Sequence, residues 1–257
     1  MIEKSSLIYE YDGSFEGIMC CVFESYYKRE IPMDIISSDR FQTTFFPVKE
    51  IETDLKKSTR VIKSIPEKIG SSALELLKYA FLTCMPHKEL NMLMFLRKGF
   101  HYGPPIMYMF KDEHVDKMLK AVRHLKNESH LLKGFIRFSI LGGILVSQIG
   151  PKNYVLPLIA GHFCRRYAGE HFLIHDKTHN MALVYRPRQY AVVPMCNFKM
   201  AEPDSREKHF RKLWELFYTT VEIKDRRNFK YRRSNMPKHY WKYMTEFQKG
   251  SYFKDNE

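Results

Sequence analysis

The sequence lacks the features that mark several large classes of protein. Cysteine occurs five times and never in a Cys-x-x-Cys pair, which excludes a zinc ribbon and an iron–sulfur cluster. The first residues show no basic segment followed by an apolar run, so no signal peptide is predicted. The most apolar stretch, residues 134–149, contains Arg137 and falls short of the roughly 18 uninterrupted apolar residues of a membrane span. We therefore expect a cytoplasmic protein with no membrane partner.

Familiar catalytic motifs are absent as well. The sequence contains no glycine-rich phosphate loop, no Gly-x-Ser-x-Gly elbow and no His-Glu-x-x-His pair. It also lacks the Cys-x-x-x-Cys-x-x-Cys triplet of a radical S-adenosylmethionine cluster and a water-activating motif of uracil-DNA glycosylases. No motif therefore indicates autonomous catalysis, and the sequence leaves open whether the chain is an enzyme.

Positive charge is in excess. The 257 residues include 42 Lys and Arg against 29 Asp and Glu, a net charge of +13, while 44% hydrophobic residues are enough for a sizeable core. Such a balance favours polyanionic partners such as nucleic acid or an anionic membrane surface, although a basic surface also serves solubility alone.

Hydrophobic periodicity divides the chain into three stretches and predicts an α+β protein. Residues 1–128 form a mainly helical lobe with one N-terminal strand, and a Ser72-x-x-Glu75 capping box opens one of its helices. Residues 129–200 form an antiparallel sheet with a crossover helix, and residues 201–257 form a basic, aromatic-rich helical segment. No long linker separates the stretches, so we expect them to pack into one compact body.

The middle stretch predicts a small antiparallel β-β-α-β-β-β sheet. Strands are expected over residues 135–140 and 144–149, joined by a hairpin at Gly142-Gly143, and a helix over 154–167. Three more strands, over 172–175, 181–185 and 190–193, follow with short connections, which favour antiparallel pairing. In the third stretch, we expect Leu213, Trp214, Leu216 and Phe217 to be the buried side of a helix.

The segment from Lys224 to Lys242 has the strongest local excess of positive charge in the chain, with eight Lys and Arg against one acid. Cations among aromatic rings suit a phosphate backbone with stacked bases. The alternative is a solvated edge whose rings anchor the tail on the core. The residues that we expect to bind nucleic acid are Arg226, Arg227, Lys230, Arg232, Arg233, Lys238, Lys242, Tyr231, Tyr240 and Trp241.

Imidazole and carboxylate groups form a second candidate site. Glu128, His130, His162 and His175 are candidate ligands for a divalent metal, and His130, His162 and Asp176 are candidate general acids or bases. The structural alternatives are a satisfied core or interface histidine for His162 and a turn cap for Asp176.

Four blocks in order resemble a known family. They are residues 11–17 (YDGSFEG), 128–138 (ESHLLKGFIRF), 155–167 (VLPLIAGHFCRRY) with 174–176 (IHD), and 236–242 (MPKHYWK). Together they resemble the bacterial "probable DNA metabolism protein" family. Leu131 and Gly161 depart from the family pattern, which has an Arg at the first position and often a Pro at the second.

The resemblance implies partners rather than chemistry. Members are typically encoded beside a radical S-adenosylmethionine protein of DNA modification or repair, and some are fused to a uracil-DNA glycosylase-like domain. The family has no agreed catalytic residues. We therefore expect a DNA-binding accessory protein that works on single-stranded or damaged DNA with that radical S-adenosylmethionine partner, and with a uracil-DNA glycosylase-like protein as a further partner. The alternatives are a metal-dependent hydrolase or base-processing enzyme acting on nucleic acid, and a scaffold that contacts only protein.

Overall fold

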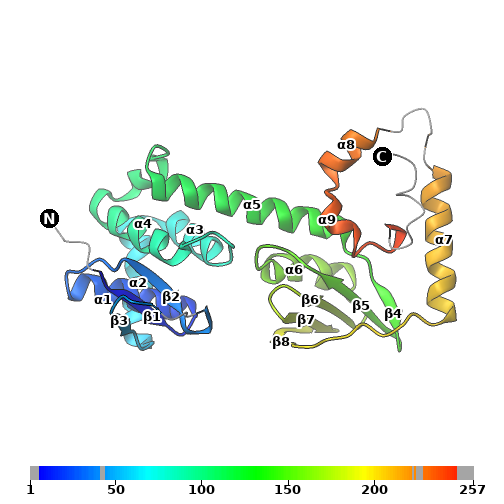
Figure 1. The fold of residues 1–257 in the computed structure, drawn as a ribbon, viewed down its shortest axis with the longest axis horizontal. Coiled ribbons are helices and arrows are strands. Elements are labelled where there is room, and N and C mark those ends of the chain that lie inside the picture. The colour runs from blue at the N-terminus through cyan, green and yellow to red at the C-terminus, as the bar shows by residue number, and fades with distance from the viewer. Residues whose placement is uncertain (1–5, 41–43, 222, 224–227, 248–257) are drawn as a thin grey trace. The chain divides into compact units, whose positions relative to one another are not determined.

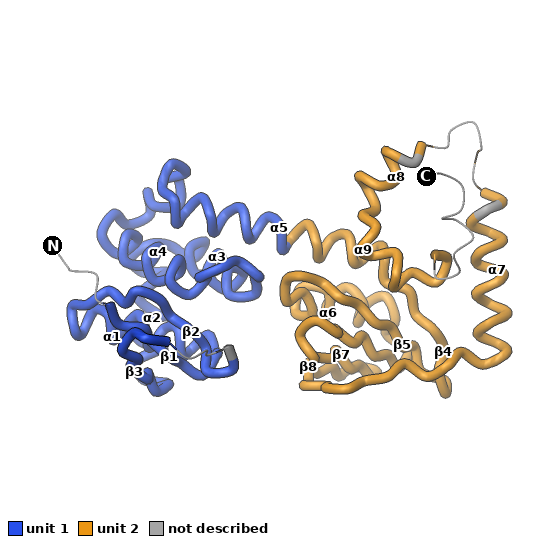
Figure 2. The backbone as a smooth tube through the Cα atoms, in the orientation of Figure 1, with its two compact units in different colours: residues 1–125 blue, residues 126–257 orange. Residues whose placement is uncertain are grey.

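The fold was analysed in a computed structural model, which describes residues 6–40, 44–221, 223 and 228–247. It confirms the predicted α+β class. The chain divides into unit 1, residues 1–125, and unit 2, residues 126–257 (Figure 2). Unit 2 thus joins the expected sheet and the C-terminal segment, and the packing of all stretches into one body stays a prediction. No helix among the described residues combines the length and apolar composition that crossing a membrane requires.

Unit 1 contains a three-stranded parallel sheet where the sequence predicted one strand. The strands are β1 (Ile8–Tyr11), β2 (Asp34–Ser37) and β3 (Val48–Glu50), in the order β2-β1-β3 (Figure 1). Tyr9 of β1 pairs with Ile35 on one side and Lys49 on the other. The prediction missed β2 and β3 because neither the DIIS sequence of β2 nor the VKE sequence of β3 alternates apolar and polar residues.

Helices surround the core of unit 1. They are α1 (Phe15–Tyr27), α2 (Leu55–Lys68), α3 (Ser71–Phe81), α4 (Lys88–Tyr102) and the first turns of α5 (Glu113–Phe135), with short 3-10 helices η1 (Ser38–Arg40) and η2 (Pro104–Tyr108). Ser14 caps α1 by accepting from Gly17 N at 2.9 Å. The capping box expected at Ser72 is wrong, because α3 begins at Ser71 after an N-cap at Gly70.

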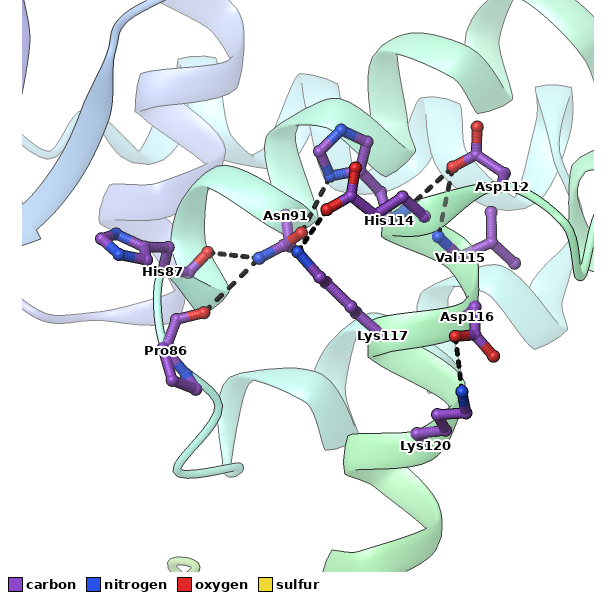
Figure 3. Close-up of polar contacts among 10 residues, drawn as sticks. Pro86, His87, Asn91, Asp112, His114, Val115, Asp116, Lys117 and Lys120 are labelled. Atoms are coloured by element: carbon purple, nitrogen blue, oxygen red, sulfur yellow. Dashed lines mark hydrogen bonds and ion pairs between the residues drawn. The ribbon is translucent and has the colours of Figure 1, made fainter.

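Polar contacts attach the start of α5 to α4 (Figure 3). The carboxylate of Asp112 accepts from His114 N and Val115 N and so caps the helix. The His114 ring donates from Nδ1 to Asn91 Oδ1 at 2.8 Å, and Asn91 Nδ2 donates to the His87 carbonyl at 2.8 Å. Because Asn91 is buried on α4, these bonds fix the first turn of α5 on unit 1.

Unit 2 contains a five-stranded sheet in the order β4-β5-β6-β7-β8. Its elements are β4 (Ser139–Leu141), β5 (Ile144–Ile149), α6 (Leu156–Arg166), β6 (Phe172–Asp176), β7 (Met181–Arg186) and β8 (Gln189–Pro194). The predicted element order and the Gly142-Gly143 hairpin are correct, and both glycines have positive φ angles, 58° and 81°.

The sheet is mixed rather than antiparallel. β5 and β6 pair in parallel, with Leu145 opposite Phe172, while the other neighbours are antiparallel. The prediction was wrong at this pair because α6, between the two strands, packs against β7 and β8 and returns the chain to the end at which β5 began. A second correction concerns the first strand, since α5 continues to Phe135 and β4 begins only at Ser139.

The C-terminal part of unit 2 is helical. It contains α7 (Ser205–Val221), α8 (Phe229–Asn235), α9 (Lys238–Trp241) and the 3-10 helix η4 (Thr245–Phe247). The first half of α7 lies at the β4 edge of the sheet (Figure 1). The side of α7 that was expected to be buried is exposed: the exposed fractions are 47% for Leu213, 38% for Trp214, 62% for Leu216 and 56% for Phe217. A helical period identifies an apolar stripe but does not show what covers it.

Candidate functional site

A cavity of about 620 Å³ lies within unit 2, between the end of α5, the β4 edge of the sheet, α6 and α7. We call it the unit 2 pocket. Its cations are Lys133, Arg137, Arg166 and Arg211, and its rings are Phe138, Phe163, Tyr167, Phe210 and Trp214. Among the described lining residues, Glu207 is the only acid. The pocket therefore combines aromatic surface with positive charge.

The rings of the unit 2 pocket have two different roles. Phe138 packs edge-on against Phe163 and Tyr167, with ring centroids 5.7 Å and 5.1 Å apart, and this cluster forms a rigid wall. Phe210 and Trp214 on α7 are 46% and 38% exposed, so their rings remain accessible to a ligand. These two rings supply flat apolar surface at the mouth of the pocket.

Two of the four cations are already neutralised. Arg137 Nη2 lies 2.8 Å from Glu246 Oε1, and Arg211 Nε lies 2.9 Å from Glu207 Oε1. Lys133 and Arg166, in contrast, form no ion pair with any carboxylate of the described residues. Their charges are available to an anionic ligand.

Glu207 holds α7 in place beside the pocket. Its buried carboxylate accepts from Arg211 Nε and from Ile140 N of β4, at 2.9 Å and 3.1 Å. Burial opposes ionisation, but these bonds, a bond from Ser139 and the charge of Arg211 outweigh it and lower the pKa of Glu207. Arg211 Nη2 also donates to Ser139 Oγ at 2.7 Å, which fixes the α7 rings relative to the sheet.

His162 on α6 lies in a region of positive charge beside the pocket. Burial and the neighbouring charges of Lys133, Arg166 and Arg165 lower the pKa of this histidine. Its Nε2 atom is buried and has no hydrogen-bond partner among the described residues. Whether His162 is a core or interface histidine, as in the structural alternative, or a functional one stays open. These three cations disfavour the charged form of the imidazole, and a bound anion would offset that effect.

The basic C-terminal segment is only partly exposed. Arg226 and Arg227 lie outside the described residues, while Lys230, Arg233, Lys238, Lys242 and Tyr231 are exposed. Arg232 is half-buried, with its guanidinium 5.5 Å from the centre of the Trp241 ring.

Tyr240 and Trp241 anchor this segment on unit 2. They are 5% and 6% exposed, and Trp241 Nε1 donates to the Met236 carbonyl at 2.9 Å. The Trp241 ring also stacks on Phe247 with centroids 4.8 Å apart. Both rings are covered, so a base-stacking role for them does not fit this arrangement, whereas the anchoring alternative does.

The proposed metal ligands do not form a cluster. Among the described residues, no group of three or more His, Cys, Asp or Glu could hold a metal ion. The Glu128 carboxylate accepts from Lys152 N and from both nitrogens of Asn153, and therefore holds the loop before α6. His175 lies buried between Gln148 and the Met195 carbonyl, and His130 is exposed on α5.

Residues 86–246 match a family described as "Domain of unknown function (DUF4130)". The match covers more than half of the chain. The chain belongs to this family. DUF4130 is the family linked to DNA metabolism proteins, and the matched range includes every residue that lines the unit 2 pocket. The comparison with curated proteins found no match.

Sequence reasoning missed a further polar pair within the DUF4130 range. Asp176, fully buried at the end of β6, caps the next turn by accepting from Thr178 N and His179 N, which agrees with the turn-cap alternative. Its second oxygen also lies 2.7 Å from His179 Nδ1. The i,i+3 spacing of Asp176 and His179 was the available signal.

Sequence reasoning also missed the unit 2 pocket itself. Lys133, Arg137, Phe163 and Arg166 lie in the blocks that carry the family resemblance, yet cations and rings of this kind are common on any basic protein. Phe210 on α7 was not considered because the apolar face of that helix was expected to be buried. The signal for the site was the convergence of four segments that lie far apart in the sequence, and this convergence is visible only in the fold.

Proposed function

We propose that this DUF4130 chain is a DNA-binding accessory protein of cytoplasmic DNA repair or modification, and that the unit 2 pocket is a DNA-binding site. The observation that carries the proposal is the pairing of accessible rings with unneutralised cations around one cavity. The cations can bind the phosphate groups of a nucleotide, and the aromatic rings can stack on its base.

The charges suit a phosphate backbone. Lys133 and Arg166 lack carboxylate partners among the described residues, and Arg165 adds a third cation beside His162. If these three meet phosphates, log affinity for a single strand should fall with log salt at a slope of roughly −2. The exposed Lys230, Arg233, Lys238 and Lys242 offer further, weaker phosphate contacts on the same unit.

The rings favour unpaired bases. Phe210 and Trp214 are 46% and 38% exposed, and the Trp214 ring already stacks on Phe217, so Phe210 is the ring more open to a base. A base in a duplex cannot stack on a side chain without leaving its neighbours. Single-stranded or damaged DNA pays less of that unstacking cost than an intact duplex. We therefore propose that the chain prefers such DNA.

The surroundings of the pocket support an accessory role. The metal ligands expected from the sequence are engaged in structural bonds or lie apart, and the family link is to DNA metabolism. We propose that the chemistry comes from a partner, the radical S-adenosylmethionine protein implied by the family resemblance, with a uracil-DNA glycosylase-like protein as a second partner. Co-purification of the first partner with the full chain tests this part of the proposal.

Binding of DNA is tested by fluorescence anisotropy with a labelled single strand and the matching duplex. Phe210→Ala should weaken single-strand binding by about 1–3 kcal/mol with an unchanged salt slope, because stacking releases no counterions. Arg166→Ala should weaken binding and reduce the slope by about 0.7. Tyr190→Ala and Lys177→Ala are matched controls, since both residues are exposed on unit 2 outside the pocket. Equal affinities for pocket and control variants would refute the proposal.

One observation favours a second candidate, a base-processing enzyme. Asp176 orients the His179 ring through Nδ1 and leaves Nε2 for proton transfer, which is the geometry of an oriented general base. The test is release of a modified base from oligonucleotides by the purified chain. His179→Gln should abolish such release and leave DNA affinity unchanged. If the native chain releases no base, the base-processing proposal is refuted.

A further inference from the structure

A second groove lies in unit 1, far in sequence from the site just described. It has a volume of about 800 Å³ and lies between α1, α2 and α4. We call it the unit 1 groove. The segments of α1 and α2 that line it precede residue 86, where the DUF4130 match begins. The family match therefore says nothing about these two sides of the groove.

Aromatic rings form one side of the unit 1 groove. Phe23, Tyr26 and Tyr27 come from α1 and Phe100 from α4. Tyr27 is 71% exposed and Tyr26 is 42% exposed, so both offer ring surface to a ligand. The Phe23 and Tyr27 rings stack on each other, with centroids 6.2 Å apart and an interplanar angle of 15°, which holds the exposed Tyr27 ring in a fixed orientation. Such a ring takes a planar ligand group.

The other side of the groove is basic, and each cation lies over one of the rings. Arg97 lies 4.7 Å from the centre of the Tyr26 ring, Lys68 lies 5.8 Å from that of Phe100, and Arg60 lies 6.0 Å from that of Phe23. No acid occurs among the described lining residues, and none of the three cations pairs with a described carboxylate. The groove carries positive charge without a protein counterion.

The spacing of the cations indicates an extended anion. Arg60, Ser64 and Lys68 follow each other at i, i+4 and i+8 and therefore share one face of α2. Eight residues of α-helix span about 12 Å, so the two cations project from backbone positions that are more than two turns apart along the groove. A chain of phosphates, or a nucleoside with several phosphates, fits this row.

We propose that the unit 1 groove binds nucleotides, with a base stacked on Tyr27 and phosphates along the Arg60–Lys68 row. The ligand can be a stretch of single-stranded nucleic acid or a free nucleoside polyphosphate, since both present the same base and phosphate groups. An acidic peptide offers charge but fewer planar groups, and the exposed tyrosines favour the nucleotide. This inference does not depend on the unit 2 pocket.

Ring variants of the full chain test the stacking part. Labelled oligothymidylate and labelled ATP are titrated separately, so that the two ligand sources are distinguished. Tyr27→Ala should weaken binding of at least one of them roughly 5- to 100-fold, the ratio expected for loss of one stacked base. Tyr27→Phe keeps the ring and should bind normally. Tyr108→Ala is the control, because Tyr108 is 76% exposed on unit 1 outside the groove.

Charge variants test the phosphate part. The double variant Arg60→Glu, Lys68→Glu should reduce the salt slope for oligothymidylate by about 1.4, whereas Lys63→Glu, which alters an exposed residue of α2 outside the groove, should not. Competition by poly-glutamate as effective as that by unlabelled oligothymidylate would overturn the inference in favour of an acidic protein partner. Equal binding by Tyr27→Ala and Tyr108→Ala would also overturn it.

The proposals for the two sites can be refuted independently of each other. Phe210→Ala and Arg166→Ala alter only the unit 2 pocket, and Tyr27→Ala alters only the unit 1 groove. Loss of binding in the first pair alone supports the proposed function and refutes the groove. Loss in Tyr27→Ala alone supports the groove and refutes the pocket.

Discussion

Arg137 Nη2 lies 2.8 Å from Glu246 Oε1, and the side chain of Glu246 is only 1% exposed. The same guanidinium lies 5.6 Å from the centre of the Trp214 ring. Arg137 thus connects η4 to α7 and to the segment that precedes β4. A buried carboxylate that loses its partner keeps the cost of its burial, so this contact is expected to matter for stability.

We expect Arg137→Met to lower the free energy of unfolding by about 2–3 kcal/mol, because the methionine keeps the aliphatic volume but leaves Glu246 uncompensated. Denaturant unfolding measures the loss. The double variant Arg137→Met, Glu246→Gln should recover part of it, since the amide is neutral. A double variant less stable than the single one would show that the buried charge is not the cause.

Trp241→Ala should lower the free energy of unfolding by about 3–5 kcal/mol, because the ring is buried against Phe247 and leaves a cavity. Tyr231→Ala, at a ring that is 70% exposed, should change it by less than about 0.5 kcal/mol. Limited proteolysis should cleave the C-terminal segment faster in the Trp241 variant alone. A fully stable Trp241→Ala protein with weakened DNA binding would contradict the anchoring role.

The pH dependence of His162 follows from its lowered pKa, caused by burial and then by Lys133, Arg166 and Arg165. Below the ordinary histidine value of 6.5, the unfolded chain takes up a proton more readily than the folded chain. Stability should therefore fall as pH falls from about 6.5 towards the folded-state pKa. His162→Gln should remove this part of the decline, which thermal melts between pH 5 and pH 8 would detect.

DNA binding should favour protonation of His162. A phosphate near Lys133 and Arg166 favours the charged imidazole, so affinity should rise as pH falls below about 6.5, with uptake of a proton. The control is His171→Gln, since His171 is exposed and lies outside the pocket. A pH profile that is the same in the His162→Gln and native proteins would place the DNA elsewhere.

Glu207 gives a prediction at acid pH. Its pKa lies below the ordinary value of 4.5, because the hydrogen bonds from Arg211, Ile140 N and Ser139 outweigh burial. The stabilisation that comes from the charged form is present above about pH 4.5 and is lost as pH falls through the folded-state pKa. The stability gap between the native protein and Glu207→Gln should therefore close in that range. A constant gap from pH 7 to pH 3 would show that charge is not involved.

The sequence predicted the elements whose signal is local. β6, β7 and β8 are short apolar runs joined by short turns, and the Gly142-Gly143 pair marks its hairpin directly. α6 has Pro157 in its first turn, where the missing N–H costs nothing. α2 was missed, because it buries only Ser58, Val61 and Ile65 and contains Pro66.

Features that depend on distant partners could not be predicted. The parallel pairing of β5 with β6 depends on where α6 packs, and the exposure of Trp214 depends on what does not cover α7. The unit 2 pocket joins Lys133, Phe163 and Phe210 from separate segments. The C-terminal rings were predicted to contact DNA because their composition is right, but composition does not distinguish a buried ring such as Trp241 from an exposed one such as Tyr231.

The parallel pair β5 and β6 sets an order of folding for unit 2. The hairpins β4-β5 and β6-β7-β8 close over short turns, so each can form early from local contacts. Joining Leu145 to Phe172 closes a much longer loop that contains α6, and its entropic cost is recovered only when the whole sheet is in place. We infer that two half-sheets form first and that their union is the rate-limiting step. Until that step, the inner edges of β5 and β6 are open to strands of other molecules, so refolding yield should fall as protein concentration rises.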